Sequence, residues 1–513
     1  MSEQSNILKQ VAGGAGIIFI GTFLFYVFRF AYQVVIARYL GPEDYGLISL
    51  GIMILNLSIL IPLLGINEGI VHYIAYYRSI GNKIRLKSTF LTALKITLPL
   101  SIITTATLIF FSKQIAINLF HNAELTPILI IFSLIIPFYT LLILAVNAMV
   151  ALKKPEYTII SRIFGREFIN LLLTITIVLI GGTVLQLSLI YLLSFAIGSL
   201  LSLYLLEYKV FPFIRSKIKT VHEYKELLAF SMPLFFSGIF LKIMSSIDTF
   251  FLGYMKTTVD VGIYNAVLPL AASLGIFLIA FSQMFYPIMS ELHAKKQHTE
   301  LARTYSIVLR WIFMLSFPVM ILSLLFPKYI LSILFGTNYA TGATAFTILI
   351  VAYFIDVITG PAVRILMTLK KTKLIFYINA IVMILNVVLN IILIPLYGIT
   401  GAAIATGISI VLREIIIFNT ARKYIQFGYK LKSYFKYTLS AILPVLLIYP
   451  AMKLITISII SLMVAVAVFF GLYLLLLLLF KSFRKEDKMI ILAMSEKVGI
   501  DLTFFEEIVK KFQ

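Results

Sequence analysis

The sequence contains no cysteine, so the protein has no disulfide framework and no metal site with thiolate ligands. Acidic side chains are also scarce: 22 Asp and Glu stand against 43 Lys and Arg, which gives a formal net charge of +21. Charged residues make up only 13% of the chain, whereas 61% of the residues are hydrophobic. Because soluble domains contain about 45–50% apolar residues, this composition predicts a membrane protein.

Apolar runs that are long enough to cross the hydrocarbon core, which takes about 20 residues, recur along the whole chain. They predict an all-α polytopic membrane protein with 14 transmembrane helices. The expected spans are residues 11–38, 45–75, 86–111, 127–152, 157–180, 184–208, 227–254, 262–290, 304–326, 343–369, 374–396, 400–421, 434–455 and 458–480. The stretch MSEQSNILKQ lacks the positive cluster and cleavage site of a signal peptide, so we expect the first helix to be retained.

Basic residues are distributed unevenly over the expected loops. The loops on one side hold only Arg38, Lys113, Lys256, Lys328 and Lys453, and the termini and the opposite loops hold many more. The positive-inside rule assigns the basic side to the cytoplasm. We therefore expect a multi-pass protein of the cell membrane with both termini in the cytoplasm, and we attribute the positive charge to topology rather than to nucleic-acid binding.

Landmark residues recur at a spacing of 216 positions: Gly46 and Gly262, Lys154 and Lys370, Asn170 and Asn386, Gly182 and Gly398. The spacing predicts two parallel repeats related by an axis along the membrane normal. The expected parts are an N-lobe with helices 1–6 (1–210), a cytoplasmic linker (211–226), a C-lobe with helices 7–12 (227–425), two appended helices (434–480) and a cytoplasmic amphipathic tail (481–513).

Two basic residues lie deep in the expected spans, Arg29 in the first helix and Lys242 in the seventh. A charge at the bilayer centre costs about 2.5–3.5 kcal/mol on translocon scales, so each side chain should face water or a partner. Tyr26, Arg29 and Gln33 share one face of the first helix. The pattern predicts a hydrated cavity between the lobes in which Arg29 holds an anion. An ion pair of Arg29 with Asp248 or Glu68 is the alternative.

Other polar residues also fall inside spans. Four polar side chains are candidates for sugar contacts, with interhelical hydrogen bonding as the alternative: Tyr26, Gln33, Asn56 and Gln283. Asp248 and Asp356 are candidate ion-coupling residues, and Asp248 is also a candidate partner of Lys242. Five further cations near cytoplasmic ends are expected to snorkel toward the head groups: Lys95, Arg162, Arg310, Arg364 and Arg413. Arg166 is deeper, and its neighbour Glu167 is a candidate partner.

Residues 34–50 read VVIARYLGPEDYGLISL: one helix ends in ARYLG, and Pro-Glu-Asp-Tyr-Gly opens the next. This segment resembles the start of the polysaccharide and oligosaccharide flippases of the multidrug/oligosaccharidyl-lipid/polysaccharide exporter superfamily. The resemblance implies a transporter with two pseudo-symmetric six-helix lobes in a V shape, plus two appended helices. It also implies that helices 1, 2, 7 and 8 line a central cavity.

Related flippases hold a substrate pyrophosphate with basic residues of this cavity. The resemblance implies this role for Arg29 and Lys242, and a contact near the outer face for Arg38. The lipid II branch uses cavity arginines on helices 1, 2 and 8. Because helices 2 and 8 of this sequence contain no Arg or Lys, the resemblance favours another sugar–lipid substrate.

The sequence therefore predicts a flippase that moves a lipid-linked oligosaccharide from the cytoplasmic to the outer leaflet by alternating access. The alternatives are a cation-coupled exporter of amphipathic small molecules and a multispan glycosyltransferase; the short outer loops disfavour the enzyme. We expect no cofactor and no metal, with H+, Na+ or the membrane potential as candidate energy sources. The expected partners are the substrate, membrane lipids and glycosyltransferases of the same pathway, and the expected state is a monomer.

Overall fold

The computed structural model describes residues 2–221, 224–295, 297–369, 371–424, 431–454 and 459–482. This part of the chain is helical and contains no strand, as predicted. Most of the expected amphipathic tail, residues 483–513, lies outside the described residues. The chain divides into two compact units, Met1–Ala266 and Val267–Gln513, which are described separately below.

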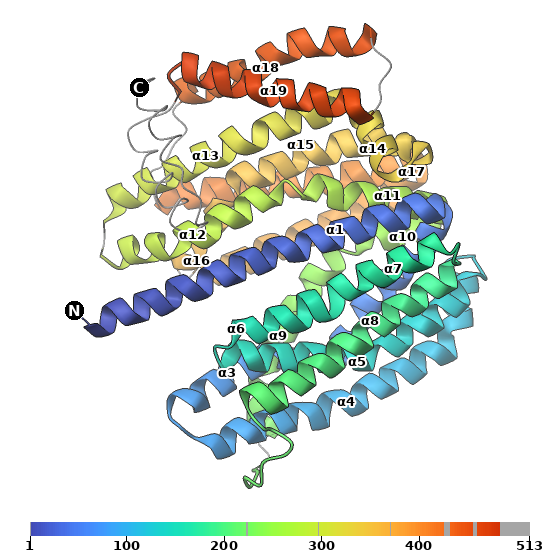
Figure 1. Cartoon of the computed structure of the whole chain (residues 1–513), viewed down its shortest axis with the longest axis vertical. Helices are drawn as coiled ribbons and strands as arrows, with labels where there is room; N and C mark the ends of the chain where they lie inside the picture. The colour runs from blue at the N-terminus through green and yellow to red at the C-terminus, as the bar shows by residue number, and fades with distance from the viewer. Residues whose placement is uncertain are drawn as a thin grey trace. The chain divides into compact units, whose positions relative to one another are not determined.

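In the first unit, α5 packs on α1, α3, α4 and α8. Figure 1 shows α4, α5, α7 and α8 running side by side, and α1 also packs on α5 and α7. The elements are α1 (Ser2–Ser58), α2 (Leu60–Leu63), α3 (Ile66–Ser79), α4 (Lys83–Gln114), η1 (Ile115–Leu119), α5 (Leu125–Ala151), α6 (Pro155–Ile159), η2 (Ile160–Phe168), α7 (Ile169–Leu179), α8 (Val184–Leu205), η3 (Leu206–Val210), α9 (Tyr224–Met244) and α10 (Ile247–Met255).

The second unit begins within α11 (Thr258–Ala272). Its remaining elements are α12 (Gly275–Ala294), α13 (His298–Leu325), α14 (Pro327–Phe335), η4 (Thr337–Gly342), α15 (Ala343–Thr359), α16 (Pro361–Thr368), α17 (Thr372–Tyr424), α18 (Leu431–Leu454) and α19 (Ile459–Leu479). α15 packs on α13 and α17, and α18 packs on α13 and α19. The Tyr473 hydroxyl of α19 donates to the Met314 carbonyl of α13 at 2.8 Å, which fixes α19 to the unit.

The expected spans are all helical where the structure describes them, but several are interrupted or joined. Gly41 has φ 77° and ψ 176°, so the first two spans meet at a break inside α1, and Pro42 starts the second helix in a favoured position. Gly398, with φ 55°, breaks α17 in the same way. Within the described residues, ten helices are long and apolar enough to cross a membrane, so the number of 14 crossings stays a prediction.

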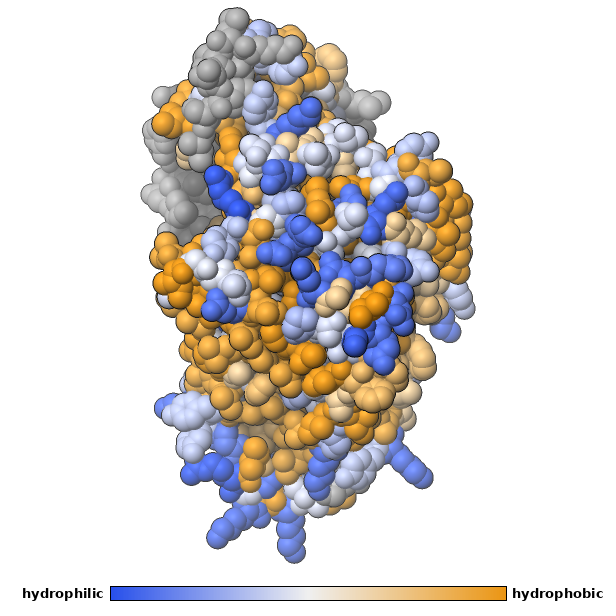
Figure 2. Space-filling view, turned by 90° about the vertical axis from the view of Figure 1, so that its right-hand side faces the viewer, coloured by the Kyte–Doolittle hydropathy of each residue, from blue (hydrophilic) through white to orange (hydrophobic). Residues whose placement is uncertain are grey.

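Large apolar side chains are exposed on the described surface, including Phe110, Leu179, Ile180 and Leu396. Figure 2 shows wide orange areas of apolar residues and separate blue patches of polar residues. Exposed apolar areas of this extent are typical of a surface that faces lipid. With the long apolar helices, they establish a multi-pass membrane protein.

The boundary between the two compact units differs from the expected boundary between lobes. α9 packs on α3, and α10 packs on α1, so both helices belong to the first unit. The predicted lobes, residues 1–210 and 227–425, are defined by the 216-residue spacing and not by compactness. This division therefore stays a prediction.

The segment that precedes α9 is bound to α4. The buried Lys87 ammonium donates to the Ser216 carbonyl and to the Ile218 carbonyl at 3.3 Å. Three residues further on, the Val221 backbone N–H donates to the Ser88 hydroxyl at 2.9 Å. The expected linker is thus fastened to the first unit up to residue 221.

Candidate functional site

Arg29 lies on α1 with an exposed side chain, and its guanidinium carbon is 5.9 Å from the centre of the Phe25 ring. The guanidinium carbon of Arg162, which lies on η2, is 4.5 Å from the centre of the same ring. A cation over an aromatic face gains about 0.5–1 kcal/mol at exposed sites. Phe25 therefore brings together two guanidinium groups from segments that are far apart in the sequence.

Lys242 on α9 adds a third cation. Its ammonium group donates to the Asn56 side-chain oxygen at 3.0 Å, so the two predicted site residues are in contact. Both are half-buried, and the Arg29 charge acts electrostatically on Lys242. Among the residues that the structure describes, no carboxylate pairs with Arg29, Arg162 or Lys242. Arg29, Arg162 and Lys242 are thus three cations of the first unit that have no carboxylate partner among the described residues.

The remaining site candidates occupy different environments. Tyr26 is 42% exposed on the same helix as Arg29, and its ring contacts Phe25 edge-on at 5.5 Å between centroids. Arg38 is exposed near the Gly41 break. Gln283 lies on α12, and its side chain lies outside the described part. Tyr26 therefore borders the cations, whereas Arg38 lies about two and a half turns along the helix from Arg29.

Gln33 is buried and holds the backbone of α11. Its side-chain N–H group donates to the carbonyls of Asn265 and Ala266 at 3.1 and 3.3 Å. Pro269, four residues after Asn265, has no N–H to offer the Asn265 carbonyl in the helix. The Tyr45 hydroxyl also donates to this carbonyl, at 3.4 Å. In this structure Gln33 thus replaces a missing backbone donor, a role that the proline spacing can indicate from sequence.

The alternative ion pairs of Arg29 are absent from the described residues. Asp248 is 5% exposed and accepts a hydrogen bond from the Tyr264 hydroxyl at 2.6 Å. The Glu68 side chain accepts from the Asn67 amide at 3.1 Å. Asp248 is therefore part of a buried contact between α10 and α11, and it does not balance the Lys242 charge.

Arg166 forms the ion pair with Glu167 that the sequence suggested. The guanidinium also donates to the Tyr191 hydroxyl at 2.9 Å and lies 4.0 Å from the centre of the Phe195 ring. Glu167 is 2% exposed. This pair connects η2 to α8 inside the first unit, which explains a deep arginine without invoking a ligand.

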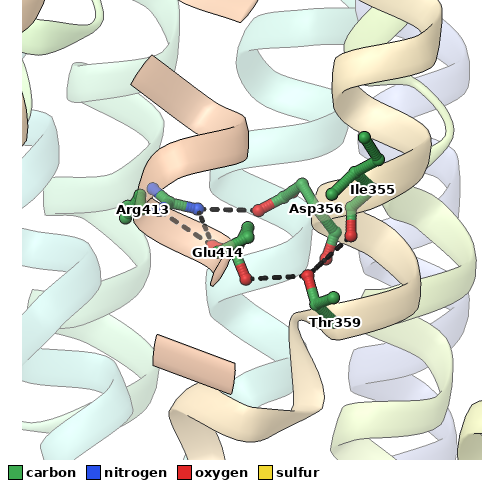
Figure 3. Close-up of polar contacts among 5 residues, drawn as sticks. All are labelled: Ile355, Asp356, Thr359, Arg413 and Glu414. Atoms are coloured by element: carbon green, nitrogen blue, oxygen red, sulfur yellow. Dashed lines mark hydrogen bonds and ion pairs between the residues drawn. The ribbon is translucent and has the colours of Figure 1, made fainter. Parts of the chain in front are cut away.

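Asp356 lies in the second unit and does have a basic partner. The Arg413 guanidinium on α17 is 2.7 Å from carboxylate oxygens of both Asp356 and Glu414 (Figure 3). Instead of snorkelling as expected, Arg413 therefore joins α17 to α15. Glu414 was not identified from sequence. Its neighbours on α15 are more than 50 positions away, and no spacing rule relates them.

Comparisons with known proteins agree with this architecture. The family described as "Polysaccharide biosynthesis protein" matches residues 11–293, more than half of the chain. The chain belongs to this family. The MatE family also matches residues 233–392. Both matches place the chain in the exporter superfamily predicted from the ARYLG segment, so it is a transporter rather than an enzyme.

Two curated relatives match parts of the chain. A putative O-antigen transporter of Shigella flexneri is 24% identical over 39% of this chain and 49% of its own length. The probable flippase AglR of Haloferax volcanii is 26% identical over 36% of this chain and 39% of its own length. The matches thus span half or less of the length of these relatives.

Solved structures share the fold at low sequence identity. The lipid II flippase MurJ in an inward closed conformation has a TM-score of 0.70 and 16% identity, covering 90% of this chain and 98% of MurJ. An inward-facing multidrug transporter of the MATE family has a TM-score of 0.63 and 15% identity, covering 78% of this chain and 94% of its own. The chain therefore shares the fold of these structures over most of its length.

Proposed function

We propose that the protein is a flippase for an oligosaccharide or polysaccharide precursor linked to polyprenyl phosphate or diphosphate. The observation that carries this proposal is the group of three cations, Arg29, Arg162 and Lys242, that lacks a paired carboxylate among the described residues. Relatives named as an O-antigen transporter and a probable flippase support it.

The chemistry of such a substrate matches the site. A hydrated sugar and its phosphates cannot enter hydrocarbon without losing their hydrogen bonds. Guanidinium groups form two parallel hydrogen bonds to phosphate oxygens, so Arg29 and Arg162 would hold the phosphates. Lys242 would add a point charge, held in place by Asn56. Tyr26, exposed beside Phe25, would contact the sugar.

The transport cycle that fits these parts is alternating access. In this proposal the protein works as a monomer in the cell membrane with both termini in the cytoplasm, and it carries substrate from the cytoplasmic to the outer leaflet. Rocking of two repeats would expose the site to each side in turn. H+, Na+ or the membrane potential would supply the energy, and glycosyltransferases of the same pathway would supply the substrate.

The test is transport of a labelled lipid-linked oligosaccharide in reconstituted vesicles. A hydrogen bond to a charged group contributes about 1.5–3 kcal/mol, and 1.4 kcal/mol corresponds to about a factor of ten. We expect Arg29→Ala and Arg162→Ala each to slow transport about 10- to 100-fold. Lys113→Ala, which removes an exposed cation from α4, is the matched control and should transport normally. Normal transport by Arg29→Ala would contradict the anion site.

Export of amphipathic small molecules is a second candidate, favoured by the MatE match over residues 233–392. The three cations would repel a cationic drug, so this function would require neutral or anionic cargo. Efflux of such compounds from vesicles that fail to move the lipid-linked oligosaccharide would favour this candidate.

A further inference from the structure

A partly buried charge network in the second unit joins α15 and α17 (Figure 3). The Arg413 guanidinium contacts Asp356 and Glu414, each at 2.7 Å. The Asp356 side chain is 18% exposed, and the Glu414 side chain is fully buried. The network therefore combines two carboxyl groups with one guanidinium group.

The charges of the network do not balance if both carboxyl groups are ionised. Tyr353, also on α15, faces Arg413 but is neutral at ordinary pH. α16 also packs on α17 and contributes Arg364, which is exposed and whose guanidinium lies 3.8 Å from the Met367 sulfur. With Arg413 shared between two carboxylates, one buried negative charge remains, and a buried uncompensated charge is strongly unfavourable.

The Thr359 hydroxyl gives a second and independent indication. Its oxygen lies 2.6 Å from the Ile355 carbonyl oxygen and 3.0 Å from the second carboxyl oxygen of Glu414. A hydroxyl has one proton to donate. The shorter contact is the usual bond of a threonine to the carbonyl four residues earlier in its helix, and it uses that proton. The contact with Glu414 then lacks a hydrogen unless the carboxyl group supplies it.

We propose that Glu414 carries a proton in this structure, and that Asp356, Arg413 and Glu414 form a proton-binding site of the second unit. The Glu414 oxygen that faces Arg413 accepts hydrogen bonds, and the oxygen that faces Thr359 holds the proton and donates it to the hydroxyl. This arrangement satisfies each close contact and leaves the network neutral. It is independent of the anion site in the first unit.

The site would couple proton release to a rearrangement of α15 against α17. Once the proton leaves, Arg413 alone cannot neutralise two carboxylates in a buried position. The charged network is then stabilised by water entry or by separation of the two helices. A proton and a conformation of the second unit are linked in this way, whatever the protein transports.

Infrared spectroscopy of the purified full-length protein tests the assignment directly. We expect the carbonyl band of a protonated carboxyl group at neutral pH, its loss in Glu414→Gln, and its retention in Asp356→Asn. A spectrum in which Glu414→Gln removes no such band would overturn the proposal. Loss of the band in Asp356→Asn alone would overturn the assignment to Glu414.

Thermal unfolding at several pH values gives a second measurement. Glutamine has nearly the shape of a protonated glutamic acid, so Glu414→Gln should fold and should be at least as stable as the wild type at neutral pH. An unfolded glutamate ionises above a pKa of about 4.3, so the wild type should lose stability as the pH rises above that value until Glu414 releases its proton in the folded protein, and the variant should lose less. A variant that is destabilised at neutral pH and loses as much stability with rising pH as the wild type would contradict the proposal.

Discussion

Gly46 and Gly262, which occupy equivalent positions 216 residues apart, lie directly against each other. A side-chain carbon built on Gly46 would lie 1.9 Å from the Thr258 carbonyl oxygen, and one built on Gly262 would lie 1.9 Å from the Pro42 carbonyl oxygen. The contact is reciprocal, as expected where an axis relates two repeats. Only glycine lets the two backbones approach so closely.

Alanine at either glycine should therefore force the two segments apart. Overpacking of a close contact costs about 1–3 kcal/mol, and the atoms in the way are backbone rather than flexible side chains. We expect Gly46→Ala and Gly262→Ala to lower the temperature of thermal unfolding of the purified protein. Gly275→Ala is the control, because nothing lies within 4 Å of its added carbon. Equal stability of all three variants would contradict the contact.

Removal of Arg166 should destabilise the protein strongly. Glu167 would then keep a buried charge without its partner, and such a loss costs about 3–5 kcal/mol. We expect Arg166→Met to unfold at a much lower temperature than the wild type, and Arg166→Met with Glu167→Gln to recover part of the loss. Without any recovery in the double variant, the cost would lie in the contacts with Tyr191 and Phe195 instead.

Variants of Gln33 distinguish a role in stabilising the fold from a role in contacting the substrate. Gln33→Leu removes the donor to two carbonyls, and each hydrogen bond contributes about 0.5–1.5 kcal/mol. We expect a loss of stability of about 1–2 kcal/mol in denaturant unfolding. Gln33→Glu loses the donor but keeps the size of the side chain, so it should be destabilised as well. Full stability with impaired transport would instead return Gln33 to the substrate site.

Asn56 should act on transport through Lys242. Asn56→Leu leaves the ammonium group without the acceptor at 3.0 Å, so the cation is less well placed for an anion. We expect a higher substrate concentration at half-maximal transport, by about tenfold. Asn56→Asp would place a carboxylate beside the Lys242 ammonium group, which would then pair with it instead of with the substrate, so transport should be impaired further. If both variants transport like the wild type, Lys242 does not contact the substrate.

Much of the fold was predictable because bilayer crossing imposes a simple composition on each helix. The apolar runs located the helical stretches, and the glycine spacing predicts a repeat whose equivalent residues Gly46 and Gly262 lie in contact. The breaks were harder to predict. Gly41 and Gly398 sit between expected spans, whereas the π-helical stretch η2 lies inside one expected span, where it packs on α8.

The site was predictable only where one helix contains the pattern. Arg29 and Lys242 stood out as charges in apolar runs; the structure shows Arg29 exposed and Lys242 half-buried, and their role in substrate binding stays a prediction. Arg162 and Glu414 acquire their importance from segments far away in the sequence, Phe25 for the first and Asp356 for the second. Such pairings depend on tertiary contacts, which spacing along one helix cannot reveal.

Residues 216–221 are hydrogen-bonded to α4, so this segment is held against the first unit rather than free to move. α9, which carries Lys242, begins three residues after Val221. Extra residues inserted after Ser216 would disrupt the hydrogen bonds of Lys87 to the Ser216 and Ile218 carbonyls and would shift the start of α9. The length of the segment 216–221 therefore helps to set the position of Lys242, although this segment contains none of the candidate site residues.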